Sequence, residues 1–284
     1  PIRSINDPLA AVRVSGQVNK ISYMTIGAID RNTPIIVPGI EKSNTIESDL
    51  QSFVGITRMK YNFKDDNYIG VMFLNRNLKD GHNIVPGIDW NYKLSKNIYL
   101  KGEAFLSQTS ELNDSSLLSE SRDFGKSGFD AATDGEKYSG SGLNITLQRS
   151  ARNYSFRLRY SDYSPTFQAY NGIFTQNDYR SLFTSQSYLI YFDEKMINWI
   201  QFSGYGSLRY DHLNNFREVF FMPGLNINLI GQSFISIDFL AVNNEVFRDV
   251  EFKNIQRINY YLSSSPKKFI FFEVNAETGK FIYR

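Results

Sequence analysis

The stretch FVGITRMKYNFKDDNYIGVMFLNR, residues 53–76, has the pattern of two β-strands joined by a tight turn. Its first half places hydrophobic residues at alternate positions, with the basic residues Arg58 and Lys60 between them. Because successive side chains of a strand point to opposite faces, this pattern predicts one apolar face and one charged face. After a turn at Lys64-Asp65-Asp66, the return segment 67–74 is about long enough for a tilted strand to cross a hydrocarbon core of roughly 30 Å.

The same alternation recurs along the chain and predicts fourteen antiparallel strands. They cover residues 10–18, 21–31, 48–63, 67–76, 84–94, 97–108, 136–149, 153–163, 179–191, 198–210, 217–229, 232–243, 252–263 and 269–276. Short turns alternate strictly with longer polar loops, which fall near residues 32–47, 77–83, 109–135, 164–178, 211–216 and 244–251. Short turns at one rim and long loops at the other are typical of an up-and-down transmembrane β-barrel.

Alternation alone does not choose between lipid and water, because a soluble β-sandwich alternates in the same way. The predicted strands, however, run about 10 to 14 residues, against about 5 to 6 in globular proteins. Aromatic residues also gather beside the short turns, as in an interfacial girdle: Tyr61, Phe63, Tyr68, Tyr92, Tyr99, Tyr154, Tyr191, Phe192 and Trp199. Since aromatic residues suit strands in any solvent, a soluble β-rich carbohydrate-binding protein is kept as an alternative.

Composition bounds the function without deciding it. The 284 residues show no linker or change in composition, so we expect a single domain over residues 1–284. The net charge of +2 and the scattered basic residues disfavour nucleic-acid binding, and the absence of cysteine excludes disulfides and thiolate metal sites. The mean hydropathy of −0.35 suits strands that face a polar lumen on one side.

The ends of the sequence carry a further expectation. An outer-membrane protein must be exported, and the sequence starts at Pro1. We therefore expect the barrel domain to be mature or truncated at one or both ends, with sequence continuing beyond Arg284.

The charged residues of the strands belong inside the barrel if the membrane interpretation holds. A lipid-facing Arg or Lys near the bilayer midplane costs about 2 to 4 kcal/mol. These residues either line a conduit or solvate a closed lumen, and the predicted lumen-lining set is Arg58, Lys60, Lys101, Glu103, Arg157 and Arg159.

Two loops carry further hypotheses. We expect the loop 109–135, which is rich in Ser, Asp, Glu and Gly, to be mobile or to fold over the mouth. Asp178 and Arg180 enter a predicted strand together, and an ion pair between them across the lumen would hold the loop 164–178 inward. The alternative is that the two charges are separately hydrated at the rim.

Catalytic chemistry has one weak candidate. Only two histidines exist, His82 and His212, and Asp211 precedes the second, which invites an acid/base or metal hypothesis. Neighbouring side chains usually point apart, so a solvated loop histidine is the simpler interpretation. No HExxH, Walker or GxSxG motif occurs, and we expect no cofactor and no metal site. An outer-membrane hydrolase acting on glycans or lipids at the loop-side mouth remains the alternative function.

Several segments resemble a known family. They are Ala11–Val18, residues 26–29, 53–58, 69–73 and 85–90, and above all the loop Phe167 to Arg180 with Asn171-Gly172-Ile173-Phe174 and Asn177-Asp178-Tyr179-Arg180. Together they resemble the DUF5916 family, an outer-membrane β-barrel domain of unknown function that usually follows a family 9-like carbohydrate-binding module. The resemblance implies a location in the Gram-negative outer membrane, with outer-membrane lipid as a partner and a glycan as a second partner through an attached module.

These observations predict a porin-like, non-enzymatic barrel that acts as a membrane anchor or a pore. The resemblance adds an association with carbohydrate binding or uptake. The transported solute, the openness of the lumen, the total strand number and the oligomeric state are not specified by the sequence.

Overall fold

The chain is built from β-strands and their connections. A computed structural model describes residues 8–46, 49–64, 66–117, 122–193, 196–248 and 250–282. Within these ranges, no helix is long and apolar enough to span a bilayer. The predicted turn residue Asp65, parts of the predicted 192–197 turn and 109–135 loop, and Tyr283 lie outside the described residues.

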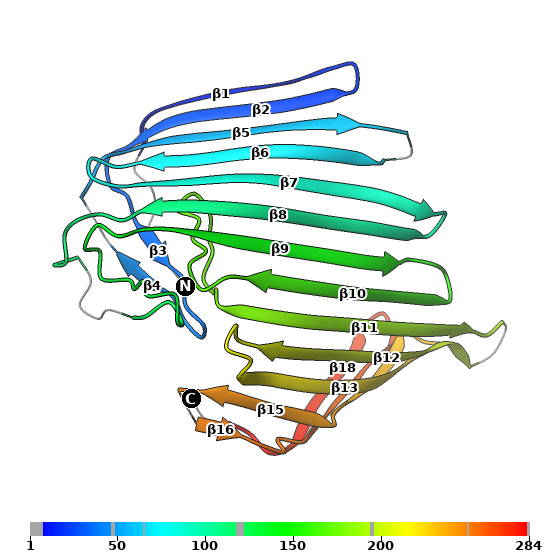
Figure 1. The fold of residues 1–284 in the computed structure, drawn as a ribbon. Helices are drawn as coiled ribbons and strands as arrows, with labels where there is room; N and C mark the ends of the chain where they lie inside the picture. The colour runs from blue at the N-terminus through cyan, green and yellow to red at the C-terminus, as the bar shows by residue number, and fades with distance from the viewer. Residues whose placement is uncertain are drawn as a thin grey trace.

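One large antiparallel sheet contains all fourteen predicted strands in chain order (Figure 1). The all-β antiparallel prediction is confirmed, and most boundaries agree within a few residues. The strands are β1 Pro8–Val18, β2 Ile21–Asp30, β5 Ser52–Asn62, β6 Tyr68–Asn77, β7 His82–Ser95, β8 Ile98–Ser110, β9 Lys137–Arg149, β10 Tyr154–Tyr163, β11 Tyr179–Tyr191, β12 Ile197–Tyr210, β13 Phe216–Leu229, β14 Ser233–Leu240, β17 Arg257–Lys267 and β18 Ile270–Gly279.

Two predicted loops contain short hairpins that the sequence did not reveal. The segment after β2 forms β3 (Ile35–Val37) and β4 (Asn44–Ile46), which pair as a separate two-stranded sheet. The segment after β14 forms β15 (Val242–Phe247), which pairs with β13, and β16 (Val250–Phe252), which pairs with β15. Strands of three to six residues are too short to show a period, so the alternation pattern missed them.

Register separates the sheet into two faces, because directly paired residues of antiparallel strands share a face. One continuous rung contains Ile69, Trp90, Gly102, Ile145, Tyr160 and Leu182. The neighbouring rung lies on the opposite face and contains Lys60, Gly70, Asp89, Glu103, Asn144 and Ser161. We call these the apolar face and the polar face.

The apolar face is exposed along most of the sheet. Val12, Tyr92 and Leu106 are 64%, 54% and 61% exposed, and large apolar side chains on β5, β6, β11, β12 and β14 are exposed in the same way. The predicted aromatic girdle is split by the register. Tyr61 and Tyr92 belong to the apolar face, whereas Tyr68 and Tyr99, beside the same turns, share the polar face with Asn62 and Lys93.

The two rims of the sheet differ as expected for alternating connections. The short turns, such as Asn19–Lys20 and Lys96–Asn97, lie at one rim, on the right of Figure 1, and we call it the turn rim. The longer connections lie at the opposite rim, the loop rim, together with the β3–β4 hairpin. The sheet is open among the described residues: β1 and β18 end its main strand order, and β16 ends the side branch that β15 starts on β13. It curls so that β17 and β18 lie behind β12 and β13 (Figure 1).

The buried apolar core lies in the loops rather than behind the sheet. Its largest cluster combines Ile35 and Ile46 of the β3–β4 hairpin with Leu112 and Phe124 of the β8–β9 loop. Tyr170, from the β10–β11 loop, completes the cluster. Three connections that are far apart in sequence therefore pack together at the loop rim.

Candidate functional site

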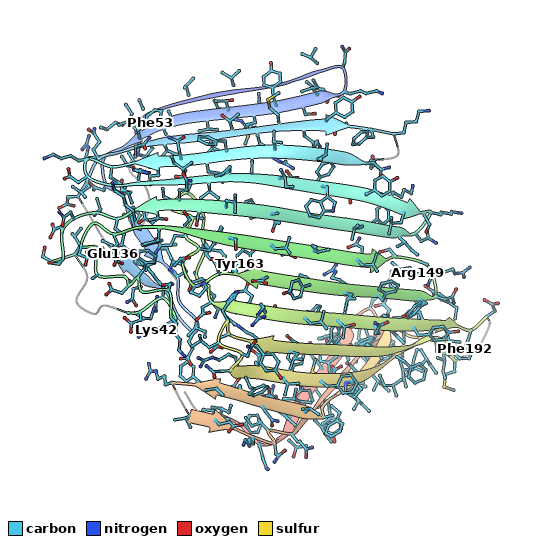
Figure 2. All side chains as sticks on the ribbon, viewed as in Figure 1. Lys42, Phe53, Glu136, Arg149, Tyr163 and Phe192 are labelled. Atoms are coloured by element: carbon cyan, nitrogen blue, oxygen red, sulfur yellow. The ribbon has the colours of Figure 1, made fainter. Side chains whose placement is uncertain are left out.

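We call the described parts of residues 31–51, 111–136 and 164–178 the loop cap. Backbone hydrogen bonds join its segments: Gly39 N donates to Thr175 O at 3.4 Å, and Asn177 N donates to Gly39 O at 3.2 Å. The guanidinium of Arg122 donates to the backbone oxygens of Lys42 and Pro38. Figure 2 shows Lys42 and Glu136 at this rim, opposite Arg149 and Phe192 at the turn rim. The cap is thus a single packed unit rather than three independent loops.

The cap rests on the polar face of β9 at two glycines. A Cβ atom at Gly140 would overlap the backbone of Thr166 and Phe167, and one at Gly142 would overlap the ring of Tyr163. Thr166 Oγ1 donates to Ser139 O at 2.6 Å beside this contact. Glycine inside a strand often marks the close approach of another backbone, and that was the available sequence signal.

Aromatic rings fill the space between the cap and the sheet. Phe167 and Phe174 pack at 4.9 Å between ring centroids, and Tyr163 lies 4.8 Å from Phe174. Phe105 of β8 and Tyr179 of β11 border the same cluster. The most distinctive part of the family resemblance, the 167–180 loop, is therefore the segment that folds onto the polar face.

Buried polar side chains fix the register of the 164–178 loop on the sheet. Asn83 donates through Nδ2 to Gln168 O at 3.2 Å, and its Oδ1 accepts from Tyr170 N at 3.0 Å. Gln168, only 1% exposed, donates through Nε2 to the Tyr138 hydroxyl at 2.8 Å. Sequence reasoning did not select Asn83 or Gln168, because their partners lie tens of residues away.

Arg76 makes a second anchor near the β2 edge of the cap. Its Nη1 lies 3.3 Å from Asp30 Oδ2, with both side chains 4% exposed. Its Nε donates to Asn171 Oδ1 at 2.9 Å, and its Nη1 donates to Ser52 Oγ at 3.2 Å. One buried cation thus joins the 164–178 loop to three strands, β2, β5 and β6.

All six predicted lumen-lining residues lie on the polar face by register. Arg58 donates through Nε to Asp89 Oδ1 at 3.3 Å and through Nη2 to Oδ2, a two-point ion pair. Lys60 lies 4.8 Å from the centre of the Tyr68 ring. Lys101 and Glu103 border a polar hollow of about 210 Å³, together with Asp89.

The remaining two residues of the set, Arg157 and Arg159, lie on β10. Arg157 lines a second polar hollow of about 380 Å³ with Ser185 and Gln201. Arg159 stacks over the Phe183 ring at 5.1 Å. Cations therefore line a polar surface between the cap and the turns.

His212 lies at the loop rim between two carboxylates from different elements. Its Nδ1 is 3.1 Å from Asp178 Oδ1, and its Nε2 is 2.9 Å from Asp162 Oδ1. Hydrogen bonding to Asp178 raises the pKa of His212, and Asp162 adds to this effect against the opposing desolvation. The geometry favours an imidazolium that donates from both nitrogens, which leaves no free ring nitrogen to act as a general base.

The Asp211 side chain points away from His212 and stabilises the β12–β13 turn. Its carboxylate accepts from the backbone N–H groups of Leu213 and Asn215 and pairs with Arg217 at 2.9 Å. Burial acts to raise the pKa of Asp211, but the hydrogen bonds from Asn215 and Arg217 outweigh it and lower the pKa. The two weak catalytic candidates thus have separate partners, and this arrangement does not favour a hydrolase.

Asp178 and Arg180 are tied to the same turn rather than to each other. Asp178 contacts His212, whereas Arg180 donates through Nη2 to Asn214 Oδ1 at 2.6 Å and to Asp211 O at 3.3 Å. Register places Arg180 opposite Asp162 on the apolar-face side of the rim, and not over the polar face. The 164–178 loop is instead held inward by Asn83 and Arg76.

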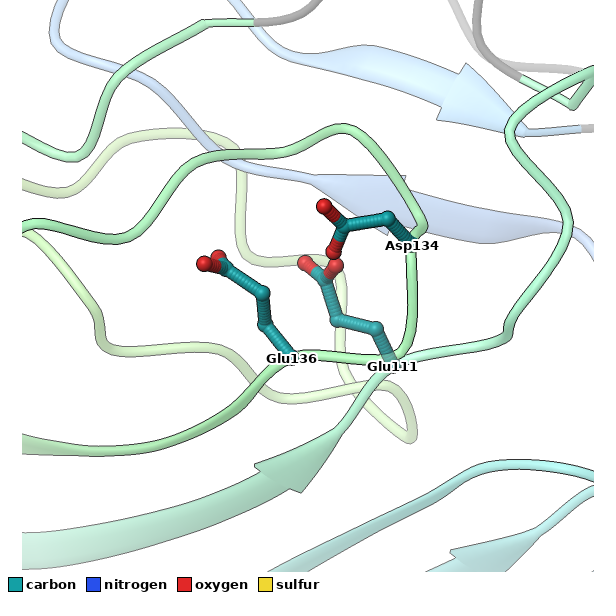
Figure 3. A group of neighbouring side chains, drawn as sticks. All are labelled: Glu111, Asp134 and Glu136. Atoms are coloured by element: carbon teal, nitrogen blue, oxygen red, sulfur yellow. The ribbon is translucent and has the colours of Figure 1, made fainter.

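One cluster at the base of the cap has the composition of a metal site. Ligand oxygens of Glu111, Asp134 and Glu136 all lie within 4.8 Å of one another (Figure 3). No sequence motif indicated this cluster, because its residues lie at the two ends of the long connection between β8 and β9.

Comparisons with known proteins add no assignment. The chain matches no family model, no curated protein and no solved structure. The resemblance to the DUF5916 family is therefore retained only as a hypothesis.

Proposed function

We propose that this chain forms the wall of an antiparallel β-barrel in the outer membrane of a Gram-negative bacterium, where it acts as a membrane anchor or a cap-restricted pore. The observation that carries the proposal is the continuity of the exposed apolar face across neighbouring strands. Soluble proteins rarely expose apolar patches larger than a few hundred Å². Lipid tails are the solvent that suits such a surface.

The length of the strands and the placement of charges on the polar face also support a lipid environment for the apolar face. Thirteen of the fourteen principal strands have 10 to 14 residues, and β14 has eight. About 9 to 11 residues are needed for a tilted transmembrane strand. The predicted lumen charges avoid the apolar face, as they must if each lipid-facing cation costs about 2 to 4 kcal/mol. A two-layer soluble sandwich would bury the apolar face, which is exposed instead.

The barrel proposal places a requirement on the sheet edges. Hydrocarbon cannot satisfy the unpaired N–H and C=O groups of an edge strand. In the membrane, the outer edges of β1 and β18 must therefore pair, either with each other or with further strands.

The choice between anchor and pore depends on the loop cap. Because the cap packs on the polar face and has its own core, it would narrow the mouth of a closed barrel. The polar hollows below it would still accept water and ions. The association with glycans rests on the family resemblance alone.

Reconstitution of the full chain tests this proposal. The protein is refolded from urea into detergent and then into planar bilayers. Stepwise current indicates a pore, whereas an inserted but silent protein indicates an anchor. A monomer that stays soluble at high concentration without detergent would contradict both, because the apolar face could not then remain exposed.

A further inference from the structure

The carboxylate cluster of Glu111, Asp134 and Glu136 lies where the β8–β9 loop begins and ends. Glu111 directly follows β8, and its backbone N–H donates to Glu136 O at 2.9 Å. Asn113 and Asp134 form an isolated bridge one step further along. Figure 3 shows the carboxylates of Glu111 and Asp134 directed toward each other, with that of Glu136 beside them. The ladder of β8 and β9 thus continues into the cap and brings three acids together.

Glu111 carries an oxygen that has no partner although it is buried. The residue is 3% exposed, and Oε1 accepts from the Tyr138 hydroxyl at 2.7 Å. Oε2 is buried without a hydrogen-bond partner. A buried polar atom that lacks a partner costs about 1 to 3 kcal/mol, and more when it is charged. This oxygen belongs to the carboxylate that faces Asp134, so a cation bound between the two acids would give it a partner.

No basic side chain neutralises the cluster among the described residues. Other buried acids of the chain are paired with arginine, as Asp89 is with Arg58 and Asp211 with Arg217. The ion pairs in the described part of the chain include none to Glu111, Asp134 or Glu136. Three carboxylates in so small a volume repel one another strongly unless a proton or a cation is shared.

Burial is the main cause that raises the pKa of Glu111 to about 7, and the charges of Glu136, Asp134 and Asp130 add to it. A cation bound between these carboxylates would offset that repulsion and supply a partner for Oε2.

We propose that Glu111, Asp134 and Glu136 bind a hard divalent cation, with Ca²⁺ as the best match, and so close the base of the β8–β9 loop. Carboxylate oxygens are the preferred ligands of such ions. Mg²⁺ is usually bound through one or two carboxylates and keeps several of its waters. Ca²⁺ accepts more protein oxygens in a flexible geometry, so a group of three carboxylates suits Ca²⁺ better.

The cation would act on the cap as a whole. Glu111 is linked through the Tyr138 hydroxyl to Gln168, which is held in the 164–178 loop. Stabilising the carboxylate therefore stabilises the contact between two cap segments. This role does not depend on the proposed membrane function, because the cluster and its links lie in the cap and at the first turn-distal residues of β9.

Terbium luminescence provides a specific test. Tb³⁺ occupies Ca²⁺ sites and is sensitised by a nearby tyrosine, and Tyr138 is in direct contact with the cluster. The full chain is refolded in detergent, treated with a chelator and titrated with Tb³⁺. We expect a saturable signal that Ca²⁺ displaces more effectively than Mg²⁺.

Two variants and a matched control decide the outcome. Glu111→Gln and Asp134→Asn are each expected to weaken binding at least about tenfold. Replacing a residue that only supports a metal ligand already costs about 10- to 100-fold in affinity, so the loss of a ligand should cost no less. Asp114→Asn removes the same charge from the same loop and should bind like the wild type, because the Asp114 carboxylate bonds to Ser116 and is not part of the cluster. Absence of a saturable signal in the wild type, or equal binding by wild type and Asp134→Asn, would overturn the proposal. Because Asp134 is exposed, its variant decides the question even if Glu111→Gln does not fold.

Discussion

The backbone of Phe167 lies directly on Gly140, so that the 164–178 loop contacts strand β9 with no side chain between them. This contact fixes the height of the cap above the polar face. It also brings the Phe167 ring to the aromatic cluster of Tyr163 and Phe174. A single glycine within a strand thus determines how closely the loop approaches.

Gly140→Ala is expected to lift the loop and lower stability by about 1 to 3 kcal/mol, the usual cost of overpacking. Limited proteolysis of the folded protein should then cut the 164–178 loop faster than in the wild type. Gly204→Ala is the control, because a Cβ there meets only the Phe221 ring at 3.9 Å. Equal cleavage rates in wild type and Gly140→Ala would show that the loop is not held at this point.

Replacing Arg76 with Met should be one of the most destabilising changes near the cap. It removes the buried ion pair between Arg76 and Asp30, and breaking a buried pair costs about 3 to 5 kcal/mol. Urea unfolding in detergent measures the loss. Lys253→Met removes an exposed pair with Glu251 and should cost less than about 1 kcal/mol. Similar losses in both variants would argue against the buried network.

The pH dependence of stability should report the imidazolium of His212. Because its pKa is raised, the folded state binds this proton more tightly than the unfolded chain does. The stabilisation is complete below the unfolded pKa of about 6.5 and is lost as the pH rises through the folded pKa. The difference in melting temperature between wild type and His212→Gln should therefore shrink from pH 6 to pH 9. A constant difference would mean that His212 carries no proton-linked stability.

If the apolar face lies against lipid and the polar face against water, an arginine should destabilise the protein on the apolar face but not at the adjacent position on the polar face. Ile145 pairs with Gly102 and Tyr160 on the apolar face, whereas Asn144 pairs with Glu103 on the polar face. In a bilayer, Ile145→Arg should cost about 2 to 4 kcal/mol. Asn144→Arg should be nearly neutral, since its charge lies beside a carboxylate. Folding yield into vesicles and urea midpoints compare the two, and equal costs would remove the distinction between faces.

Strand content and facing followed from the sequence because both are local properties. The alternation around Arg58 and Lys60 was enough to place these side chains on the polar face. The aromatic girdle prediction does not hold for Tyr68 and Tyr99, because their side chains lie on the polar face. The girdle was inferred from closeness to a turn, whereas the face of a side chain depends on whether its position is odd or even in the strand.

The cap could not be predicted, because its contacts are distant in sequence. Asn83 reaches Gln168 across 85 residues, and Arg76 reaches Asn171 across 95. No periodic pattern encodes such pairs. The cluster of Glu111 with Asp134 and Glu136 likewise depends on how a long loop closes. Gly140 was the one local signal, since a glycine within a strand predicts close approach without naming the partner.

Spin-label accessibility at two neighbouring positions tests the central claim most directly. The chain has no cysteine, so Leu158→Cys and Arg159→Cys can each carry a single label in protein reconstituted into lipid vesicles. Both residues are exposed, on opposite faces of β10. We predict that dissolved oxygen, which concentrates in lipid, reaches the label at 158, whereas a water-soluble nickel complex reaches the label at 159. Equal access of the nickel complex to both labels would contradict a lipid-facing apolar surface.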